Sequence, residues 1–387
     1  MKKKRTEGIF MKKQYDVAAY IWPAYTGDEL RTRMFWPNGI GEWETVQEMQ
    51  PRFPGHQWPR KPLWGYVNEA DPYVMEGQIA AAADHGVNVF IYDWYWFENR
   101  PFLEQCLDNG YLKAKNNDRV KFYLMWANHT ATTMWDRRIS KLNKTIWDGA
   151  VDRKTFDEII VKRTIEKYFS HPSYYKIDGK PVYMLFDFEN LVRGLGGVEA
   201  TLEALQYFRD ETVKAGFPGL SLQAGIRSAK YRAKMLDETT SILDFINRVG
   251  FDGVTIYNFH DYTTAVLTEK KGMTYEEVLE ATKKEWKLIE ETVNAPLYPH
   301  MSVGWDSNPR YPGFNPKMCL DSTPENFQKG LEMTKAYIDT HPELRAPLVT
   351  INSWNEWTEG SYLEPDDLNG YGYLEAVKKV FLDQEDK

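Results

Sequence analysis

The sequence predicts an α/β protein of the (β/α)8 TIM barrel class, with a long, aromatic-rich loop after its first strand. Three observations predict this class. Eight short apolar runs recur along the chain, amphipathic stretches with helical spacing lie between them, and the length of 387 residues suits one large barrel. We therefore expect residues 1–14 to form an N-terminal tail and residues 15–387 to form a single barrel domain.

The eight runs are rich in β-branched and aromatic residues, and they are continuously apolar, as is typical of strands buried on both faces of a parallel sheet. In order along the chain they are 17–21, 87–94, 121–128, 181–187, 220–226, 253–258, 300–305 and 348–354. A doubly wound open sheet is the structural alternative. It predicts fewer strands and a glycine-rich phosphate loop after the first one, whereas the first strand here ends in "YIWPAY".

The stretches between these runs have recognisable helix ends. Residues 71–86 open with Asp71-Pro72, a cap followed by a proline, and close at Gly86. Two later stretches begin at threonine caps. The predicted helices are 71–86, 152–172, 198–216, 274–293, 323–342 and 372–384.

Residues 23–70 interrupt this regular pattern between the first strand and its helix. The segment holds four tryptophans and several prolines, and loops of this length are uncommon unless they are functional. A loop after the first strand lies at the C-terminal face of a barrel, where active sites are built. We expect it to form a wall or lid of a site, with a packing insert over the barrel as the alternative.

Composition excludes several classes of protein. The net charge of −8 and the absence of a long basic run argue against a nucleic-acid partner. No run approaches eighteen apolar residues, so no membrane span is expected. The basic start lacks the apolar segment of a secretory signal, which predicts a cytoplasmic protein, or a periplasmic or extracellular one if the N-terminus was trimmed. The two cysteines are expected to be buried hydrophobes, and no cofactor or metal site is predicted.

The carboxyl ends of the predicted strands converge on one mouth of the barrel. They carry aromatic, acidic, amide and imidazole side chains, without the cationic cluster that phosphate transfer needs. Aromatic residues make up 15% of the chain, and their flat rings suit the apolar faces of sugars. We therefore expect a carbohydrate substrate. The residues expected to bind it are Tyr20, Trp22, Asp93, Trp94, Trp126, Asn128, His129, Tyr257, Trp305 and Asn355.

The eighth strand ends in "NSWNEWTEG", which places Glu356 and Glu359 three residues apart at the mouth. Two carboxyl groups are the minimum equipment for glycoside hydrolysis, one as proton donor and one as base or nucleophile. Like charges held close together cannot both ionise easily, so one pKa rises. We expect both glutamates to be catalytic, with a structural role for either one as the alternative.

Four long motifs resemble the WbsX-type proteins, usually described as glycosyltransferases or as glycoside hydrolase family 99-like. They are "GEWETVQEMQPRFPGHQWPR" (41–60), "HGVNVFIYDWYWFENRPFLEQCL" (85–107), "HPSYYKIDGKPVYMLF" (171–186) and "NSWNEWTEGSYLEPDDLNGYGYLEAV" (352–377). The resemblance covers nearly the whole chain in order.

The strand ends are also similar to those of the family 99 endo-α-mannosidases, which are (β/α)8 barrels. "FDGVTIYNF" resembles a segment that supplies a substrate-contacting tyrosine, here Tyr257, and "WNEWTEG" resembles the motif with the two catalytic glutamates. This resemblance implies that Glu356 is a general base acting on the sugar 2-hydroxyl, which attacks C1 to give an anhydro-sugar. It implies that Glu359 is the general acid and then the base for water, with retention of configuration.

The chain departs from these relatives after its third strand. WbsX-type proteins commonly read "WANENW", whereas this chain reads "WANHTATTMW", so His129 stands where they have a carboxylate. That difference points to a different substrate, and mannose specificity is not carried over.

Three hypotheses of function follow. A glycoside hydrolase is the main one. A glycosyltransferase of polysaccharide biosynthesis should show a diphosphate site, and a non-catalytic carbohydrate-binding protein need not keep both glutamates. The sequence leaves the sugar, the linkage, endo or exo action and the oligomeric state open.

Overall fold

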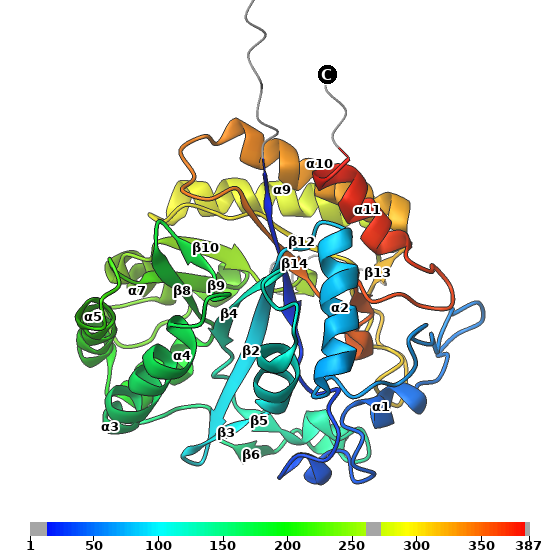
Figure 1. Ribbon diagram of the computed structural model, residues 1–387, viewed down its shortest axis with the longest axis horizontal. Coiled ribbons are helices and arrows are strands. Elements are labelled where there is room, and N and C mark those ends of the chain that lie inside the picture. The colour runs from blue at the N-terminus through cyan, green and yellow to red at the C-terminus, as the bar shows by residue number, and fades with distance from the viewer. Residues whose placement is uncertain (1–13, 261–271, 384–387) are drawn as a thin grey trace, which may run out of the picture.

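The computed structural model describes residues 14–260 and 272–383, in which eight parallel strands form a nearly closed barrel (Figure 1). Neighbouring strands follow the order β10-β9-β8-β4-β2-β1-β14-β12. Each of the eight predicted runs supplies one strand, so the predicted TIM barrel is confirmed. The strands are β1 (Asp16–Ile21), β2 (Val89–Phe97), β4 (Lys121–Trp126), β8 (Lys180–Leu185), β9 (Ser221–Ile226), β10 (Gly253–Ile256), β12 (His300–Ser302) and β14 (Leu348–Asn352).

The barrel closes between β10 and the segment that leads into β12. Val254 and Leu297 form a parallel bridge there. The backbone N–H of Val254 donates to Pro296 O over 2.9 Å, and the N–H of Tyr298 donates to Val254 O over 2.8 Å. These bonds satisfy the edge of β10, as closure of a barrel requires.

Helices cover the outside of the strands (Figure 1). Their bounds are α2 (Pro72–Asp84), α3 (Arg153–Thr155), α4 (Phe188–Leu195), α5 (Val198–Lys214), α6 (Ala229–Arg232), α7 (Ile242–Val249), α9 (Tyr275–Thr292), α10 (Pro324–Thr340) and α11 (Gly372–Phe381). Wider π-helical turns continue α3 at Phe156–Val161 and Thr164–Phe169, and a short one follows β2 at Cys106–Gly110. All six predicted helical stretches are present, whereas α4, α6 and α7 were not predicted.

The predicted helix starts are made by the expected caps. The side chain of Asp71 accepts from Tyr73 N at the start of α2, and Thr323 accepts from Asn326 N at the start of α10. At α9, Thr274 and Glu277 exchange hydrogen bonds in a capping box. These side chains satisfy backbone N–H groups that the helices themselves leave without partners.

Helix α4 was missed because of a residue just after β8. The side chain of Asp187 is the N-cap of α4 and accepts from Asn190 N. The sequence pattern had instead placed Asp187 at the end of a strand.

The aromatic-rich loop 23–70 lies at the C-terminal end of the barrel and contains the short helix α1 (Trp43–Gln47). It occupies the lower part of Figure 1 beside the ends of the strands. Trp36, Trp43 and Trp58 are buried in it, so much of the aromatic content is core. Two buried carboxyl groups, Glu42 and Glu69, come from the same loop and reach the strand ends.

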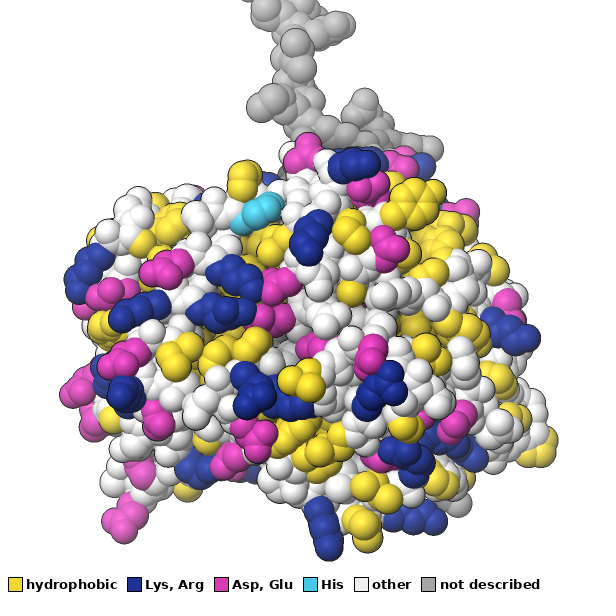
Figure 2. Space-filling model, turned by 60° about the horizontal axis from the view of Figure 1, so that its bottom comes forward, with side chains coloured by type: hydrophobic (Ala, Val, Ile, Leu, Met, Phe, Trp, Pro, Cys, Tyr) yellow, Lys and Arg dark blue, Asp and Glu magenta, His cyan; other side chains and the backbone are white. Residues whose placement is uncertain are grey.

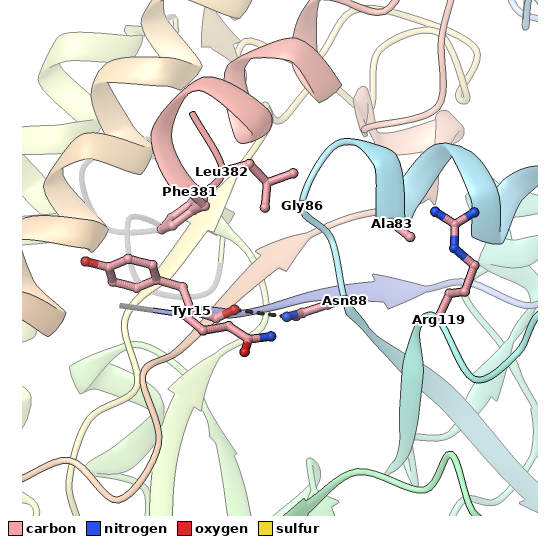
Figure 3. Close-up of a pocket in the computed structure, with 8 residues that line it drawn as sticks. Tyr15, Ala83, Gly86, Asn88, Arg119, Phe381 and Leu382 are labelled. Carbon is pink, nitrogen blue, oxygen red and sulfur yellow. Dashed lines mark hydrogen bonds between the residues drawn. The ribbon is translucent and has the colours of Figure 1, made fainter. Parts of the chain in front are cut away.

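The opposite end of the barrel is tied together by Asn88. Its Oδ1 accepts from Val17 N over 2.8 Å, and its Nδ2 donates to Tyr15 O over 2.9 Å (Figure 3). A cavity of about 370 Å³ lies beside it, with Phe381 and Leu382 on its far wall. This cavity adjoins the N-terminal ends of the strands and so lies at the end of the barrel remote from the glutamates. Within the described ranges, no helix combines the length and apolarity that a membrane crossing demands.

Candidate active site

Hydrogen bonds of the Asn355 side chain join the ends of β1 and β14. Its Oδ1 accepts from Trp22 N over 2.8 Å, and its Nδ2 donates to Trp22 O over 2.9 Å. The same Nδ2 lies 3.1 and 3.0 Å from the two carboxyl oxygens of Glu69. Asn355 is fully buried. Its hydrogen bonds fix the position of the segment that carries both glutamates.

A tight hairpin presents Glu356 and Glu359. Strand β15 (Asn355–Glu356) pairs with β16 (Ser361–Tyr362), and the backbone N–H of Glu356 donates to Ser353 Oγ over 2.7 Å. Trp357–Glu359 forms a single 3-10 turn, which ends at Gly360 with φ of 63°. That left-handed conformation favours glycine and folds the chain back so that both carboxyl groups lie on one short turn.

Tyr257 bridges two carboxyl groups at the mouth. Its hydroxyl lies 2.9 Å from Asp93 Oδ2 and 3.1 Å from Glu356 Oε1. A phenol has one proton to donate, so the second contact requires a proton on one of the carboxyl groups. Burial raises the pKa of Glu356 well above its usual range, and the charges of Glu359 and Glu42 add to this effect. Burial also raises the pKa of Asp93.

Arg310 supplies a positive charge next to this acidic group. Its guanidinium lies 3.6 Å from Glu359 Oε1 and 3.6 Å from Glu42 Oε1. Glu42 in turn accepts from the indole N–H of Trp22. All of these side chains are largely shielded from water, so their mutual interactions are stronger than the same pairs would be at the surface.

Three of the predicted residues surround this centre. Tyr20 is fully buried, donates to Ile256 O over 3.2 Å and packs edge-on against Tyr257, with ring centroids 4.9 Å apart. Trp22 packs edge-on against Tyr95. His129 Nε2 lies 3.4 Å from the Tyr95 hydroxyl, and burial lowers the pKa of His129 to about 4, so its imidazole is neutral at physiological pH.

Asn128 and Trp305 lie at other positions around the mouth. The side chain of Asn128 donates to Asp187 O over 2.7 Å and accepts from Asp187 N over 2.8 Å, which joins the ends of β4 and β8. Trp305 follows β12 and packs on His260, with ring centroids 4.8 Å apart. Trp305 also lines a pocket that includes Gly360, the residue after Glu359.

The structure does not bring Trp94 and Trp126 to the glutamates. Trp94 Nε1 donates to Glu104 Oε1 over 2.7 Å, and Trp126 stacks on Phe156 of the helical layer, with ring centroids 5.9 Å apart. Successive side chains of a strand point to opposite faces. Asp93 faces the barrel mouth, so its neighbour Trp94 faces the helices, and the two tryptophans pack between layers.

Sequence reasoning missed Glu42 and Arg310 as site residues. Glu42 belongs to the long loop, and Arg310 lies in the irregular segment between β12 and β13 (Cys319–Leu320), so neither follows a strand directly. A signal for Glu42 was present, because it stands within the first of the four family motifs. Arg310 has no such signal and is found by its contacts alone.

Figure 2 shows the end of the barrel to which the strands run. Acidic side chains gather near the middle of this face, in a shallow hollow, with Lys and Arg side chains beside them. Among the described residues, no group of three or more His, Cys, Asp or Glu side chains is arranged to hold a metal ion.

The model of one family, "Glycosyltransferase WbsX", matches residues 18–377. The chain belongs to the WbsX family. Two curated relatives, both named "Uncharacterized protein WxcX" and both from Xanthomonas campestris pv. campestris strains, are 25% identical to it over 355 residues. These alignments cover 89% of this chain and 47% of each relative, so the chain spans about half the length of the curated relatives it matches.

Two similar solved structures have names that refer to glycoside hydrolases. The family 99 endo-α-mannosidase from Bacteroides thetaiotaomicron is 16% identical, with a TM-score of 0.57 over 94% of this chain and 96% of that one. A structure named "Glycoside hydrolase-like protein" is 15% identical, with a TM-score of 0.58 over 98% and 97%. At these identities the likeness shows the fold alone. This WbsX-family chain therefore shares its barrel fold with these two structures.

Proposed function

We propose that this chain is a retaining glycoside hydrolase that cleaves a glycosidic bond in a complex glycan or polysaccharide. One observation carries the proposal. Glu356 and Glu359 stand on a single turn at the mouth of the barrel, and they have different electrostatic surroundings, Tyr257 and Asp93 for one and Arg310 for the other. Two carboxyl groups with different surroundings can divide the roles of acid and base. Arg310 by itself favours the ionised form of Glu359, so the acid role of Glu359 is taken from the resemblance to the family 99 motif.

In the first step, Glu356 removes the proton of the sugar 2-hydroxyl, and the resulting oxygen attacks C1. Glu359 donates its proton to the departing glycosidic oxygen, which leaves an anhydro-sugar. In the second step, Glu359 removes a proton from water, the water oxygen attacks C1, and Glu356 returns its proton to the 2-oxygen. Two inversions at C1 give retention, and both glutamates end as they began.

The bridge through Tyr257 supports the role of base for Glu356. With the shared proton on Asp93, the Asp93 carboxyl donates to the phenol oxygen, and the phenol donates to an ionised Glu356. Asp93 is suited to hold that proton because its burial raises its pKa well above the usual range. The raised pKa of Glu356 also makes its carboxylate a stronger base than an exposed glutamate.

The test is a glycan screen with wild type and with separate Glu356→Gln and Glu359→Gln variants. Released sugars are followed by chromatography on a panel of polysaccharides and aryl glycosides, and thermal melts check that every variant folds. We expect wild type to release sugar and each folded variant to lose the activity by several orders of magnitude. A panel with no release by wild type, on any glycan, would contradict the proposal.

A glycosyltransferase of polysaccharide biosynthesis is a second candidate, favoured by the description of the matching family model. The same screen separates the two when it is repeated with nucleotide sugars. Product that forms only when a nucleotide sugar is supplied would favour the transferase.

A further inference from the structure

A pocket of about 430 Å³ lies on the outer side of the barrel, between helix α2, the end of the loop 23–70 and Tyr371 at the start of α11. Helix α2 belongs to the layer of helices that covers the strands (Figure 1). Neither Glu356 nor Glu359 lines this pocket, and its volume falls within the range of about 300–1,000 Å³ that is usual for ligand sites. Hydrolysis at the mouth of the barrel therefore gives this pocket no role.

Aromatic side chains with polar edges form the walls of the pocket. Tyr73 is 81% exposed, Tyr371 is 36% exposed, and Trp64 is partly exposed beside them. Trp64 rests on the fully buried Trp354, with ring centroids 6.3 Å apart, and its Nε1 donates to the Tyr371 hydroxyl over 2.8 Å. The core thus holds Trp64 in place from within, and the exposed ring of Tyr73 is available to a ligand.

Gly77 lines the same pocket from the interior of α2. Glycine weakens a helix interior relative to alanine, because it gives the unfolded chain more backbone freedom to lose. A Cβ on Gly77 would meet no atom within 4 Å, whereas a Cβ on Gly330 of α10 would lie 2.5 Å from Met301 Sδ. Packing within the described chain therefore explains the glycine of α10 but not Gly77. The close approach of a bound molecule to the α2 backbone does explain it.

The polar groups of the pocket offer both a donor and an acceptor. The Tyr371 hydroxyl accepts from Trp64, and its own proton has no acceptor among the described residues. Glu76 accepts from Lys115 N through Oε1, and the described residues supply no partner for its Oε2. A sugar hydroxyl complements both groups, because it can accept from the phenol and donate to a carboxylate.

The charge of the pocket decides between kinds of ligand. Glu76 is the one charged side chain among the described residues that line it, so a phosphate or carboxylate would be repelled. A cation can pair with Glu76 but cannot accept the proton of Tyr371. The flat rings of Trp64 and Tyr73 suit the apolar face of a sugar ring. An uncharged sugar therefore fits the rings, the donor and the acceptor together.

We propose that this pocket, lined by Trp64, Tyr73, Glu76, Gly77 and Tyr371, is a second glycan-binding site that holds an uncharged saccharide on the outside of the barrel. The inference goes beyond the proposed function, because the pocket binds a saccharide whether or not the glutamates cleave one. A polysaccharide held here stays attached to the protein at a place other than the mouth.

Affinity electrophoresis tests this site in gels that contain a soluble polysaccharide, on a Glu356→Gln, Glu359→Gln background so that nothing is hydrolysed. Neutral glucans, galactans and mannans are the main probes, with polygalacturonate and glycol chitosan as charged probes. Gly77→Leu fills the pocket, and Tyr73→Ala removes an exposed ring. Ala336→Leu is the matched control, because it places the same leucine on an exposed position of α10. Thermal melts check that each variant folds, and Tyr73→Ala decides if Gly77→Leu does not.

We expect at least one neutral polysaccharide to retard the background protein. Tyr73→Ala should weaken this binding about two- to tenfold, the value of one aromatic contact, and Gly77→Leu should weaken it at least as much. Ala336→Leu should bind as the background does. Equal retardation of the Gly77→Leu and Ala336→Leu variants, undiminished binding by Tyr73→Ala, preference for a charged probe, or no retardation in any gel would overturn the second site.

Hydrolysis by wild type is measured separately, so the two proposals can fail independently. Hydrolysis together with any of these contrary results removes the second site and keeps the proposed function. Binding that depends on Gly77 and Tyr73, without hydrolysis by wild type, removes the hydrolase and keeps the second site.

Discussion

At the scale of one residue, the Tyr257 hydroxyl connects two carboxyl groups of the site but has a single proton to donate. The hydroxyl contacts Asp93 and Glu356, and both carboxyl groups have pKa values raised by burial. The three groups therefore share protons, and a change in one alters the titration of the others.

Replacement of Tyr257 by phenylalanine tests this sharing. Phenylalanine keeps the ring but gives Glu356 no donor, so the ionised form of Glu356 loses stabilisation and its pKa rises further. We expect kcat/KM on a cleaved glycan to fall about 10- to 100-fold, the value of a hydrogen bond to a charged group. The acidic limb of the pH profile should move to higher pH. A fall in kcat/KM without movement of that limb would instead mean that Tyr257 only contacts substrate.

Arg310 is a positive charge beside the acidic group, and its removal has a predictable dependence on pH. In Arg310→Gln, the carboxyl groups of Glu42 and Glu356 lose a stabilising charge, so their folded-state pKa values rise. A carboxyl group with a raised folded-state pKa contributes stability that is lost as pH rises above its unfolded-state value. We expect the loss of unfolding free energy, about 3 kcal/mol or more, to be larger at pH 8 than at pH 5.

Urea unfolding of wild type and Arg310→Gln at both pH values measures this effect. Arg232→Gln is a matched control, since Arg232 is a buried arginine that is 2.7 Å from Glu285, outside the site. Only one carboxyl group, Glu285, loses its cation in the control, so its extra loss at high pH should be smaller than that of Arg310→Gln. An equal loss at pH 5 and pH 8 in Arg310→Gln would show that the acidic group does not depend on it.

At the scale of secondary-structure elements, asparagine side chains join strand ends that no sheet hydrogen bond reaches. Asn355 bonds to both backbone groups of Trp22, and Asn128 does the same at Asp187. An amide can donate and accept at once, so it replaces one step of a strand ladder. The ends of β1 and β14, and of β4 and β8, are fixed in this way beneath the site.

Asn355→Leu should remove the hydrogen bonds between the Asn355 side chain and the Trp22 backbone, with little change in side-chain volume. The buried N–H and C=O of Trp22 lose their partner, and Glu69 loses a donor, which costs about 3 kcal/mol or more. We expect a melting temperature lower by several degrees, and a loss of activity because Glu356 is the next residue. Thermal melts and glycan cleavage measure the two effects. Unchanged stability would show that Trp22 finds other partners.

At the scale of the whole molecule, the long loop is attached to the barrel through a buried acidic pair. Glu69 of the loop and Glu364 of the eighth loop both accept from Gln78 Nε2 on α2, over 3.2 and 2.8 Å. Burial raises the pKa of Glu69 to about 7, and the pKa of Glu364 is also raised by burial and by Glu69. At neutral pH the pair holds a proton that the unfolded chain does not hold.

The stability of the barrel should therefore fall as pH rises. The folded state binds more protons than the unfolded state between about pH 4.5 and 7, so the unfolding free energy decreases across that window. Glu69→Gln cannot take up this proton, and we expect its unfolding free energy to change less between pH 5 and pH 8 than that of wild type. Urea unfolding at a series of pH values checks the slope. A slope that is the same in both proteins would contradict the shared proton.

Much of the fold could be predicted, because each strand and most helices have local signals. Apolar runs gave all eight strands, and caps such as Asp71 and Thr323 located helix starts. Helices α4 and α7 are only eight residues each, and Asp187, the N-cap of α4, was assigned to the end of a strand. The site could be predicted only in part. Glu356 and Glu359 directly follow a strand, whereas Arg310 reaches them from an irregular segment.

The sequence by itself determined that the chain is a (β/α)8 barrel and that the eighth strand delivers two glutamates to its mouth. Both follow from patterns within a few residues. Only the tertiary structure decided that Asp93 faces the mouth and Trp94 faces the helices, because a strand buried on both faces does not show which side is which. It also decided the contacts of Tyr257, Glu42 and Arg310 with these carboxyl groups. Those contacts join residues far apart in the chain, and they form only when the barrel closes and excludes water.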